Sequence, residues 1–210
     1  MNSLLRRRLA LASVVALAPL ALGLSGCAPL LMGGAAATTV LVNIDRRTSG
    51  TQVEDEAIEL KAASRIRDAF GDRVHVNVTS YNRMVLLSGE VHNEQAKAQA
   101  RAITERVENV KSVLNELAVM DKSTLTQRSN DALITGRVKA ALIDAKDVSA
   151  SAVKVVTERG TVFLMGRVTT REAERASAVA RGVPSVQKVV RAFEYLTEDE
   201  LKTLQSSFAR

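Results

Sequence analysis

The only cysteine stands where covalent lipid attachment would require it. Leu24-Ser25-Gly26-Cys27 ends an apolar run, Leu9–Leu24, that follows three arginines, Arg6 to Arg8. Small residues before a cysteine at this place form a lipobox, in which a peptidase cleaves and the thiol carries a diacylglyceryl group. We predict a signal peptide over residues 1–26 and a lipid anchor at Cys27. The alternative is an ordinary signal peptide with an incidental cysteine, or an uncleaved anchor.

The residue after the cysteine bears on location. In the sorting rule of enterobacterial lipoproteins, which this leader resembles, an aspartate there retains the protein in the inner membrane. The chain has Ala28 instead, so we expect it in the outer membrane, on the periplasmic face. Two or three acyl chains anchor far more firmly than one, because each buried methylene contributes about 0.8 kcal/mol.

Other residues able to do chemistry are few. Neither histidine, His75 or His92, has a second ligand at metal-binding spacing, so we expect no metal and no cofactor. Ser88 lies near His92, which admits a hydrolase hypothesis, but no third catalytic residue or oxyanion loop is apparent. The sequence favours a protein that is not an enzyme.

The charge of the mature chain is smaller than that of the whole sequence. Three of the 29 basic residues leave with the leader and none of the 23 acidic ones does, so 26 − 23 leaves a formal charge of +3. Aromatic residues make up 3% of the chain and tryptophan is absent. The chain therefore has no set of aromatic rings on which nucleic-acid bases could stack. Nucleic acid is an improbable partner.

A strand–turn–strand–helix pattern occurs twice. Val153–Ala180 has its turn at Glu158-Arg159-Gly160, between runs rich in β-branched residues. Val74–Ser80 and Val85–Val91 form the earlier hairpin, with Asn82-Arg83 at its turn. A register kept over two helices and three strands indicates a duplication.

The two copies also match at a glycine and along the preceding helix. Gly89 and Gly166 take the same place on the second strand of each hairpin, where we expect a helix to cross too closely to admit a Cβ. In the preceding helices, Ile58, Ala62 and Ile66 correspond to Ile134, Val138 and Leu142.

Each copy carries an L-x-G-x-V strand, Leu87–Val91 and Leu164–Val168, and in this the chain resembles BON domains, a bacterial periplasmic module. With Asp45-Arg46-Arg47-Thr48 and Gly50-Thr51-Gln52 ahead of the first copy, the whole is similar to the family of division- and outer-membrane-stress-associated lipid-binding lipoproteins.

The expected fold class is α+β, a tandem duplication of helix-strand-strand-helix-strand, each copy a three-stranded mixed sheet with two helices on one face. The predicted segments are a tether (27–53), a first BON domain (54–120), a linker (121–128), a second BON domain (129–196) and a helical tail (197–210). On the far face of the second sheet, Val156, Phe163, Met165 and Val190 are predicted to pack on the partner domain.

The tail is expected to be a short amphipathic helix. Thr197 and Glu200 form a capping box, and Leu201, Leu204 and Phe208 share a side. The helix is expected either to dock on the second domain or to contact a membrane.

The resemblance implies a ligand, anionic phospholipid, bound by the first helix of the second domain, Ser129–Ile143. The residues carried over are Leu133, Ile134, Arg137, Val138 and Lys139. Ile134 and Val138 lie on the inward stripe, whereas Arg137 and Lys139 offer charge to phosphate head groups. The relative has an aromatic residue where Leu133 stands, which implies weaker lipid affinity here.

The role that the resemblance implies is support of envelope integrity, including at the division site. The alternative is a tethered periplasmic adaptor that assists outer-membrane assembly, stress response or division proteins and binds no specific lipid.

Overall fold

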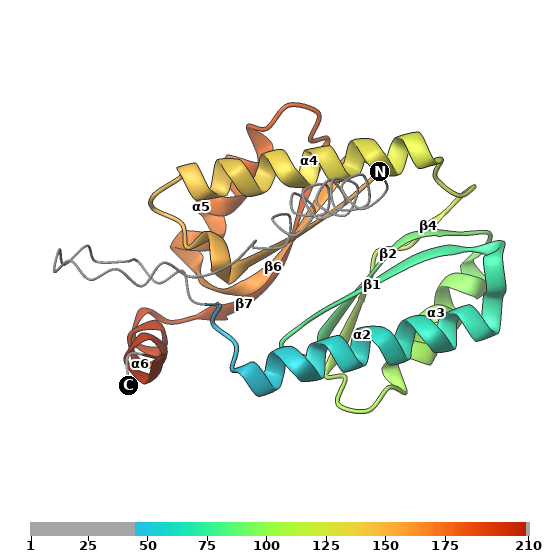
Figure 1. Ribbon diagram of the computed structural model, residues 1–210, viewed down its shortest axis with the longest axis horizontal. Coiled ribbons are helices and arrows are strands. Elements are labelled where there is room, and N and C mark those ends of the chain that lie inside the picture. Colours follow the sequence, from blue (N-terminus) through green and yellow to red (C-terminus); the bar gives the residue numbers. More distant parts are fainter. Residues whose placement is uncertain (1–44, 209–210) are drawn as a thin grey trace, which may run out of the picture. The chain divides into compact units, whose positions relative to one another are not determined.

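The computed structural model describes residues 45–208, which form two helix–sheet domains and a terminal helix (Figure 1). Cys27, the leader and the greater part of the predicted tether lie outside these residues. The first domain comprises α2 (Ser49–Phe70), η2 (Gly71–Arg73), β1 (His75–Tyr81), β2 (Met84–Val91), α3 (Glu94–Glu105), β3 (Ser112–Asn115) and β4 (Ala118–Val119). The second comprises α4 (Leu125–Asp144), η3 (Ala150–Ala152), β5 (Val153–Glu158), β6 (Thr161–Thr169), α5 (Thr170–Arg181) and β7 (Lys188–Leu196), before the terminal α6 (Glu198–Phe208).

Both domains have the predicted mixed sheet. In each, the first two strands pair antiparallel and the third pairs parallel with the second, in the orders β1-β2-β3 and β5-β6-β7. In the first domain the third strand is interrupted, so that β4 continues the pairing with β2 beyond β3. Leu117, between β3 and β4, is buried in the core. The expected fold class is confirmed.

The helices cover one face of each sheet (Figure 1). Val162, Leu164 and Val168 of β6 face a core that contains the inward sides of α4 and α5. Val85, Leu87 and Val91 of β2 do the same beneath α2 and α3, in the core that includes Ile58, Ala62 and Ile66. Alternation along a strand therefore leaves the odd-numbered side chains of β6, and the even-numbered ones of β2, on the opposite face.

Those opposite faces pack on each other. A third apolar cluster joins Phe163 and Met165 of β6 to Tyr81 and Leu86 of the first domain. Val156 and Val190 border it, together with Met84 and Leu114. The prediction that the far face of the second sheet packs on the partner domain is confirmed.

The prediction that a closely crossing helix requires Gly89 and Gly166 is wrong. A Cβ on Gly89 would lie 2.1 Å from the backbone oxygen of His75, and one on Gly166 would lie 2.2 Å from that of Ala152. The close neighbour is thus the adjoining strand and not a crossing helix. Gly89 also has a φ of +110°, which residues with a side chain rarely adopt.

A buried aspartate fixes the hairpin turn in each domain. Asn82 and Arg83 have positive φ, as do Arg159 and Gly160. Asp55 of α2 accepts hydrogen bonds from the backbone N–H groups of the first pair, each at 2.8 Å. Asp131 of α4 accepts the same two bonds, also at 2.8 Å, from the second pair. Each carboxylate thereby ties the first helix of its domain to the turn.

Both domain-opening helices begin earlier than the sequence suggested. α2 begins at Ser49, behind Thr48, whose side chain accepts from Thr51 N–H. α4 begins at Leu125 and not at Ser129, because Thr124 and Gln127 form a reciprocal capping box. The first turn of α4 therefore occupies part of the stretch assigned to the linker.

The tail forms α6. Thr197 N–H donates to Glu200, and Glu200 N–H donates to Thr197 Oγ1, so the capping box is confirmed. Leu201 is buried, which favours a docked helix; the Phe208 side chain is outside the part that the structure describes. No helix among residues 45–208 is long and apolar enough to cross a bilayer.

Asp55→Ala should lower the free energy of unfolding by about 3 kcal/mol, because two turn amides and Ser80 Oγ lose a buried charged acceptor. Urea unfolding followed by circular dichroism measures the loss. Glu56→Ala, an exposed change on the same helix, should stay within about 0.5 kcal/mol of the parent. Equal effects of the two substitutions would contradict the role given to Asp55.

Candidate functional site

The helix α4 is apolar on two opposite faces. Ile134, Val138 and Leu142 point inward and are buried. On the outward side, exposed residues recur at spacings of three, four and seven, so they lie on one side of the helix. We call this strip the outward band; it comprises Leu125, Ala132, Leu133, Gly136, Ala140 and Ile143. A helix that only served the core would need one apolar face.

The large side chains of the outward band are strongly exposed. Leu125 is 80% exposed, Leu133 59% and Ile143 65%. Between them, Gly136 has no heavy atom within 4 Å of where a Cβ would lie, so the leucines project above a low surface. The helix has 20 residues, which at 1.5 Å per residue gives a strip about 30 Å long.

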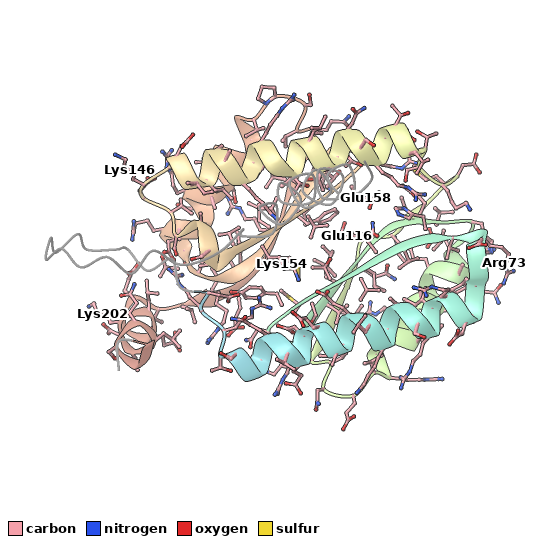
Figure 2. All side chains as sticks on the ribbon, in the orientation of Figure 1. Arg73, Glu116, Lys146, Lys154, Glu158 and Lys202 are labelled. Carbon is pink, nitrogen blue, oxygen red and sulfur yellow. The ribbon has the colours of Figure 1, made fainter. Side chains whose placement is uncertain are left out.

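Basic side chains border the outward band on both sides. Arg137 lies one turn after Leu133 on one flank, and Lys139 lies one turn before Ile143 on the other. Both are exposed, and neither forms an ion pair with any residue in the described range 45–208. Lys146, just after the helix, also points outward (Figure 2).

The structure divides the five carried-over residues into two groups. Leu133, Arg137 and Lys139 are on the surface, whereas Ile134 and Val138 are in the core and are 6% and 0% exposed. Core side chains have no access to a ligand in this conformation. Sequence reasoning missed Leu125 and Ile143 as surface residues, although Leu125 lies seven residues before Ala132 and Ile143 three residues after Ala140.

A hollow of about 600 Å³ adjoins the outward band. Leu133, Arg137 and Asn130 of α4 line one side, and Arg159 and Gly160 of the hairpin turn line another. Arg159 is already engaged, since it donates to Glu90 at 2.7 Å and to the Asp121 carbonyl at 2.7 Å. Arg137 is therefore the cation there that is available to an anionic group.

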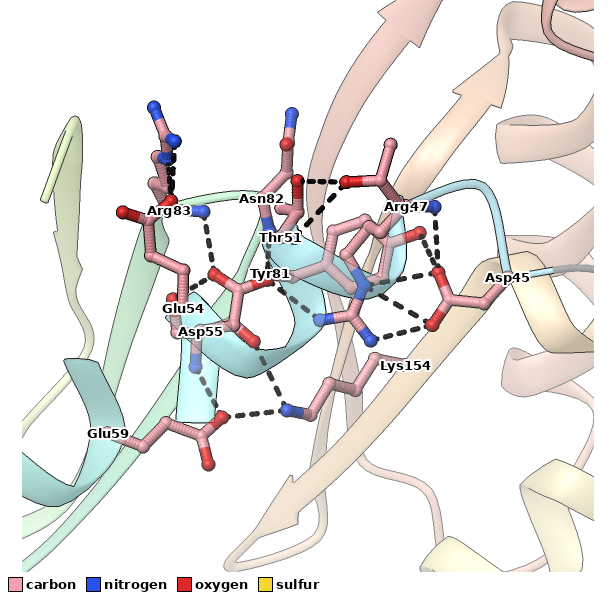
Figure 3. A network of polar contacts seen from close by, with 12 residues as sticks. Asp45, Arg47, Thr51, Glu54, Asp55, Glu59, Tyr81, Asn82, Arg83 and Lys154 are labelled. Carbon is pink, nitrogen blue, oxygen red and sulfur yellow. Dashed lines mark hydrogen bonds and ion pairs between the residues drawn. The ribbon is translucent and has the colours of Figure 1, made fainter. Parts of the chain in front are cut away.

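The stretch just before α2 is bonded to both domains. Arg46 is buried and places its guanidinium on Glu172 of α5, with N–O distances of 2.6 and 2.7 Å. Arg47 pairs with Asp45 at 2.6 Å and with Asp55 at 2.8 Å, and lies 4.2 Å above the Tyr81 ring (Figure 3). Burial raises the pKa of Tyr81 to about 12.

The two domains are also joined by polar contacts around their apolar seam. Lys154 of β5 donates to Glu59 of α2 at 2.7 Å and to the Ser80 carbonyl at 3.1 Å (Figure 3). Asn77 of β1 donates to Glu158 of β5 at 2.8 Å. These contacts join β5 of the second domain to α2 and β1 of the first.

The residues of the hydrolase hypothesis do not form a site. Ser88 Oγ is buried and has no hydrogen-bond partner among the described residues. His92 is exposed, after the end of β2. A nucleophile needs a base within hydrogen-bond reach, and no such contact joins these two side chains within residues 45–208.

His75 lies beside two carboxylates, which sequence reasoning missed. Its Nδ1 is 3.0 Å from Glu90 Oε2 and 3.9 Å from Glu158 Oε1. Glu90 faces it across the hairpin, and Glu158 comes from the other domain. Spacing along the chain gives no sign of contacts between domains.

Comparison with known proteins agrees with the fold. The BON domain model matches residues 54–121 and 130–197. The chain is 40% identical over 175 residues to the Haemophilus influenzae protein named Outer membrane lipoprotein DolP, covering 82% of this chain and 90% of that protein. It is 36% identical over 155 residues to the 21 kDa hemolysin of Actinobacillus pleuropneumoniae, covering 73% and 80%. Osmotically-inducible protein Y of Escherichia coli is 29% identical over 144 residues, covering 67% and 72%.

Two BON repeats over most of the described residues define the class, a tandem BON-domain protein. Within that class the chain belongs to the DolP family of outer-membrane lipoproteins. A lipid-anchored location at the outer membrane follows from that membership. The relatives named above are named as a lipoprotein, a hemolysin and an osmotically induced protein, and none of these names is that of an enzyme.

The buried carboxylates predict how stability depends on pH. Burial alone would raise the pKa values of Asp55, Glu90 and Glu172, but hydrogen bonds and ion pairs outweigh it and lower all three. Such groups stabilise the fold above their ordinary values of 3.8 and 4.5, and this stabilisation is lost as the pH falls through the lowered values.

The contribution of these three carboxylates to the free energy of unfolding should therefore be constant from about pH 7 to 5 and fall steeply below about pH 4. Urea unfolding at several pH values measures this dependence. Glu172→Gln should lower the free energy of unfolding at pH 7, because glutamine carries no charge to pair with Arg46. It should also make the fall in stability at acid pH less steep, because one titrating carboxylate is gone. An unchanged slope in this variant would contradict the assignment.

Proposed function

We propose that this lipoprotein binds anionic phospholipid through the outward band of α4, without catalysing a reaction. The single observation that carries the proposal is the second apolar face of α4, exposed in water and bordered by Arg137 and Lys139. Apolar side chains between cations suit the boundary between acyl chains and phosphate head groups.

The energies involved favour weak binding. Full burial of a leucine or isoleucine side chain contributes about 1.5–3 kcal/mol, and Leu125, Leu133 and Ile143 would each enter only in part. Each basic residue near an anionic surface adds about 1 kcal/mol. The sum is modest, but a protein already tethered to the same membrane has a high effective concentration there.

The outward band offers apolar contact beyond position 133, where the chain has no aromatic residue. A tryptophan there would sit at head-group depth in a way that Leu133 does not. Leu125 and Ile143, on the same line of the helix, contribute further apolar contact. The helix is proposed to lie flat in the interface, with its long axis along the membrane.

The anchor is proposed to be the acylated Cys27, on the outer membrane's inner leaflet. Support for envelope integrity, including at the division site, is the physiological role we propose, because it joins a fixed anchor to a lipid-sensing helix. The adaptor hypothesis differs in one respect, since it needs no preference for anionic lipid.

Leu133→Glu in the mature chain carrying Cys27→Ser should reduce binding to phosphatidylglycerol vesicles at least tenfold, because a charge in the band opposes both insertion and the anionic surface. Flotation on a density gradient measures the bound fraction. Leu60→Glu is the matched control, since Leu60 is 73% exposed on α2 of the other domain; it should bind like the parent.

Two outcomes of that experiment would overturn the proposal. Leu133→Glu floating as well as the parent would exclude this helix as the contact surface. Equal flotation of the parent with phosphatidylglycerol and phosphatidylcholine, unaffected by salt, would favour the adaptor.

Secreted behind a leader that is cleaved without acylation, the mature chain carrying Cys27→Ser should move from the membrane fraction to the soluble periplasmic fraction, because the helix contact alone is too weak to retain it. Fractionation followed by immunoblotting detects the change, with Leu133→Glu as the control that stays in the membrane fraction. Retention of Cys27→Ser in the membrane would contradict acylation as the anchor.

A further inference from the structure

A histidine and two glutamates meet where the two domains face each other. His75 begins β1, Glu90 lies opposite it on β2, and Glu158 ends β5 of the second domain. One ligand atom from each of the three side chains lies within 4.8 Å of the other two. The sequence analysis expected no metal at either histidine.

The distances suit a shared cation. Nδ1 is 3.0 Å from Glu90 Oε2 and 3.9 Å from Glu158 Oε1. Atoms that bind one zinc ion at about 2.0–2.1 Å in tetrahedral geometry are roughly 3.3 Å apart. The two distances from Nδ1 therefore lie within about 1 Å of the separation expected between atoms that bind one ion.

The charges of the cluster are incompletely compensated. The Glu90 side chain is 0% exposed and the Glu158 side chain 9%. Glu90 Oε1 is paired with Arg159 at 2.7 Å. Glu158 Oε2 accepts from Asn77, while its Oε1 lies 3.9 Å from His75 Nδ1, which is a cation only when protonated.

We propose that His75 Nδ1, Glu90 Oε2 and Glu158 Oε1 bind one divalent transition-metal ion of the zinc class at the junction of the two domains. One imidazole and two carboxylates suit zinc, cobalt or manganese, with water in the remaining position. The ion replaces the hydrogen between Nδ1 and Glu90, and the imidazole then carries its hydrogen on Nε2.

Neighbouring groups position the ligands. Ser123 N–H and Oγ donate to Glu90 Oε2 at 3.0 and 3.1 Å, and Arg159 holds the other oxygen. Such contacts orient a carboxylate toward an ion. A hollow of about 470 Å³, lined by His75, Glu158 and Arg128, gives access from solvent.

The test is titration of the untagged mature chain carrying Cys27→Ser, which removes the one thiol, with Zn²⁺ in a calorimeter and with Co²⁺ by visible absorption. One ion should bind per chain. His75→Gln should weaken binding at least tenfold, since loss even of an orienting residue costs about 10–100-fold. His92→Gln, which changes the other, exposed histidine, is the matched control and should bind like the parent.

Two further measurements guard against a variant that misfolds. Zn²⁺ should shift the imidazole signals of His75 and leave those of His92 unchanged in the NMR spectrum of the parent. It should also raise the melting temperature by roughly 5 °C at a hundred times the dissociation constant, because the site joins two domains.

Three results would contradict the metal site. Absence of stoichiometric binding, or equal affinity in His75→Gln, would overturn the proposal. So would a His75 signal that responds to pH and not to Zn²⁺, since the cluster would then hold only a proton.

Discussion

Each sheet of this protein has apolar side chains on both faces, but its own helices cover only one. Leu86 of β2 and Phe163 and Met165 of β6 point away from the helices and are nearly inaccessible to water. A domain of this size buries a modest core by itself, so each domain depends on the other to cover its second face. The packing of sheet on sheet is the constraint from which the remaining features follow.

The polar groups around that seam make the packing specific. Apolar contact is non-directional, whereas the contacts of Lys154 with Glu59 and of Asn77 with Glu158 are satisfied in only one arrangement of the domains. Arg46 and Arg47 add a further tie from the stretch before α2, where they meet Glu172 and Asp55. Residues 45–47, near the end of the predicted tether, are thus bonded to both domains.

The candidate membrane surface lies on the outer side of the second domain's own packing. α4 buries Ile134 and Val138 against its own sheet, while Leu133 and Ile143 stay largely exposed among the described residues. Single leucines are often exposed on protein surfaces. A line of large apolar side chains between cations along a 20-residue helix instead suits a membrane interface. The same helix therefore serves the core and the proposed ligand on opposite sides.

Much of the fold could be predicted from the sequence because the chain repeats itself. Val162, Leu164 and Val168 alternate as strand residues must, and the turns at Asn82 and Gly160 interrupt the runs where the hairpins reverse. The spacing of Asp55 and Asp131 relative to Ile58 and Ile134 was also visible. Their role could not be predicted, because the sequence does not show which turn amides donate hydrogen bonds to a carboxylate on a helix.

The sequence alone determined the duplicated strand and helix pattern and the family, and it predicts the lipobox at Cys27, because these depend on local periodicity and on motifs of neighbouring residues. Only the tertiary structure decided that Ile134 and Val138 are inaccessible to lipid, that Gly89 makes room for a neighbouring carbonyl, and that His75 meets Glu158. The physical reason is that each of these depends on contacts between segments far apart in the chain, which no local pattern encodes.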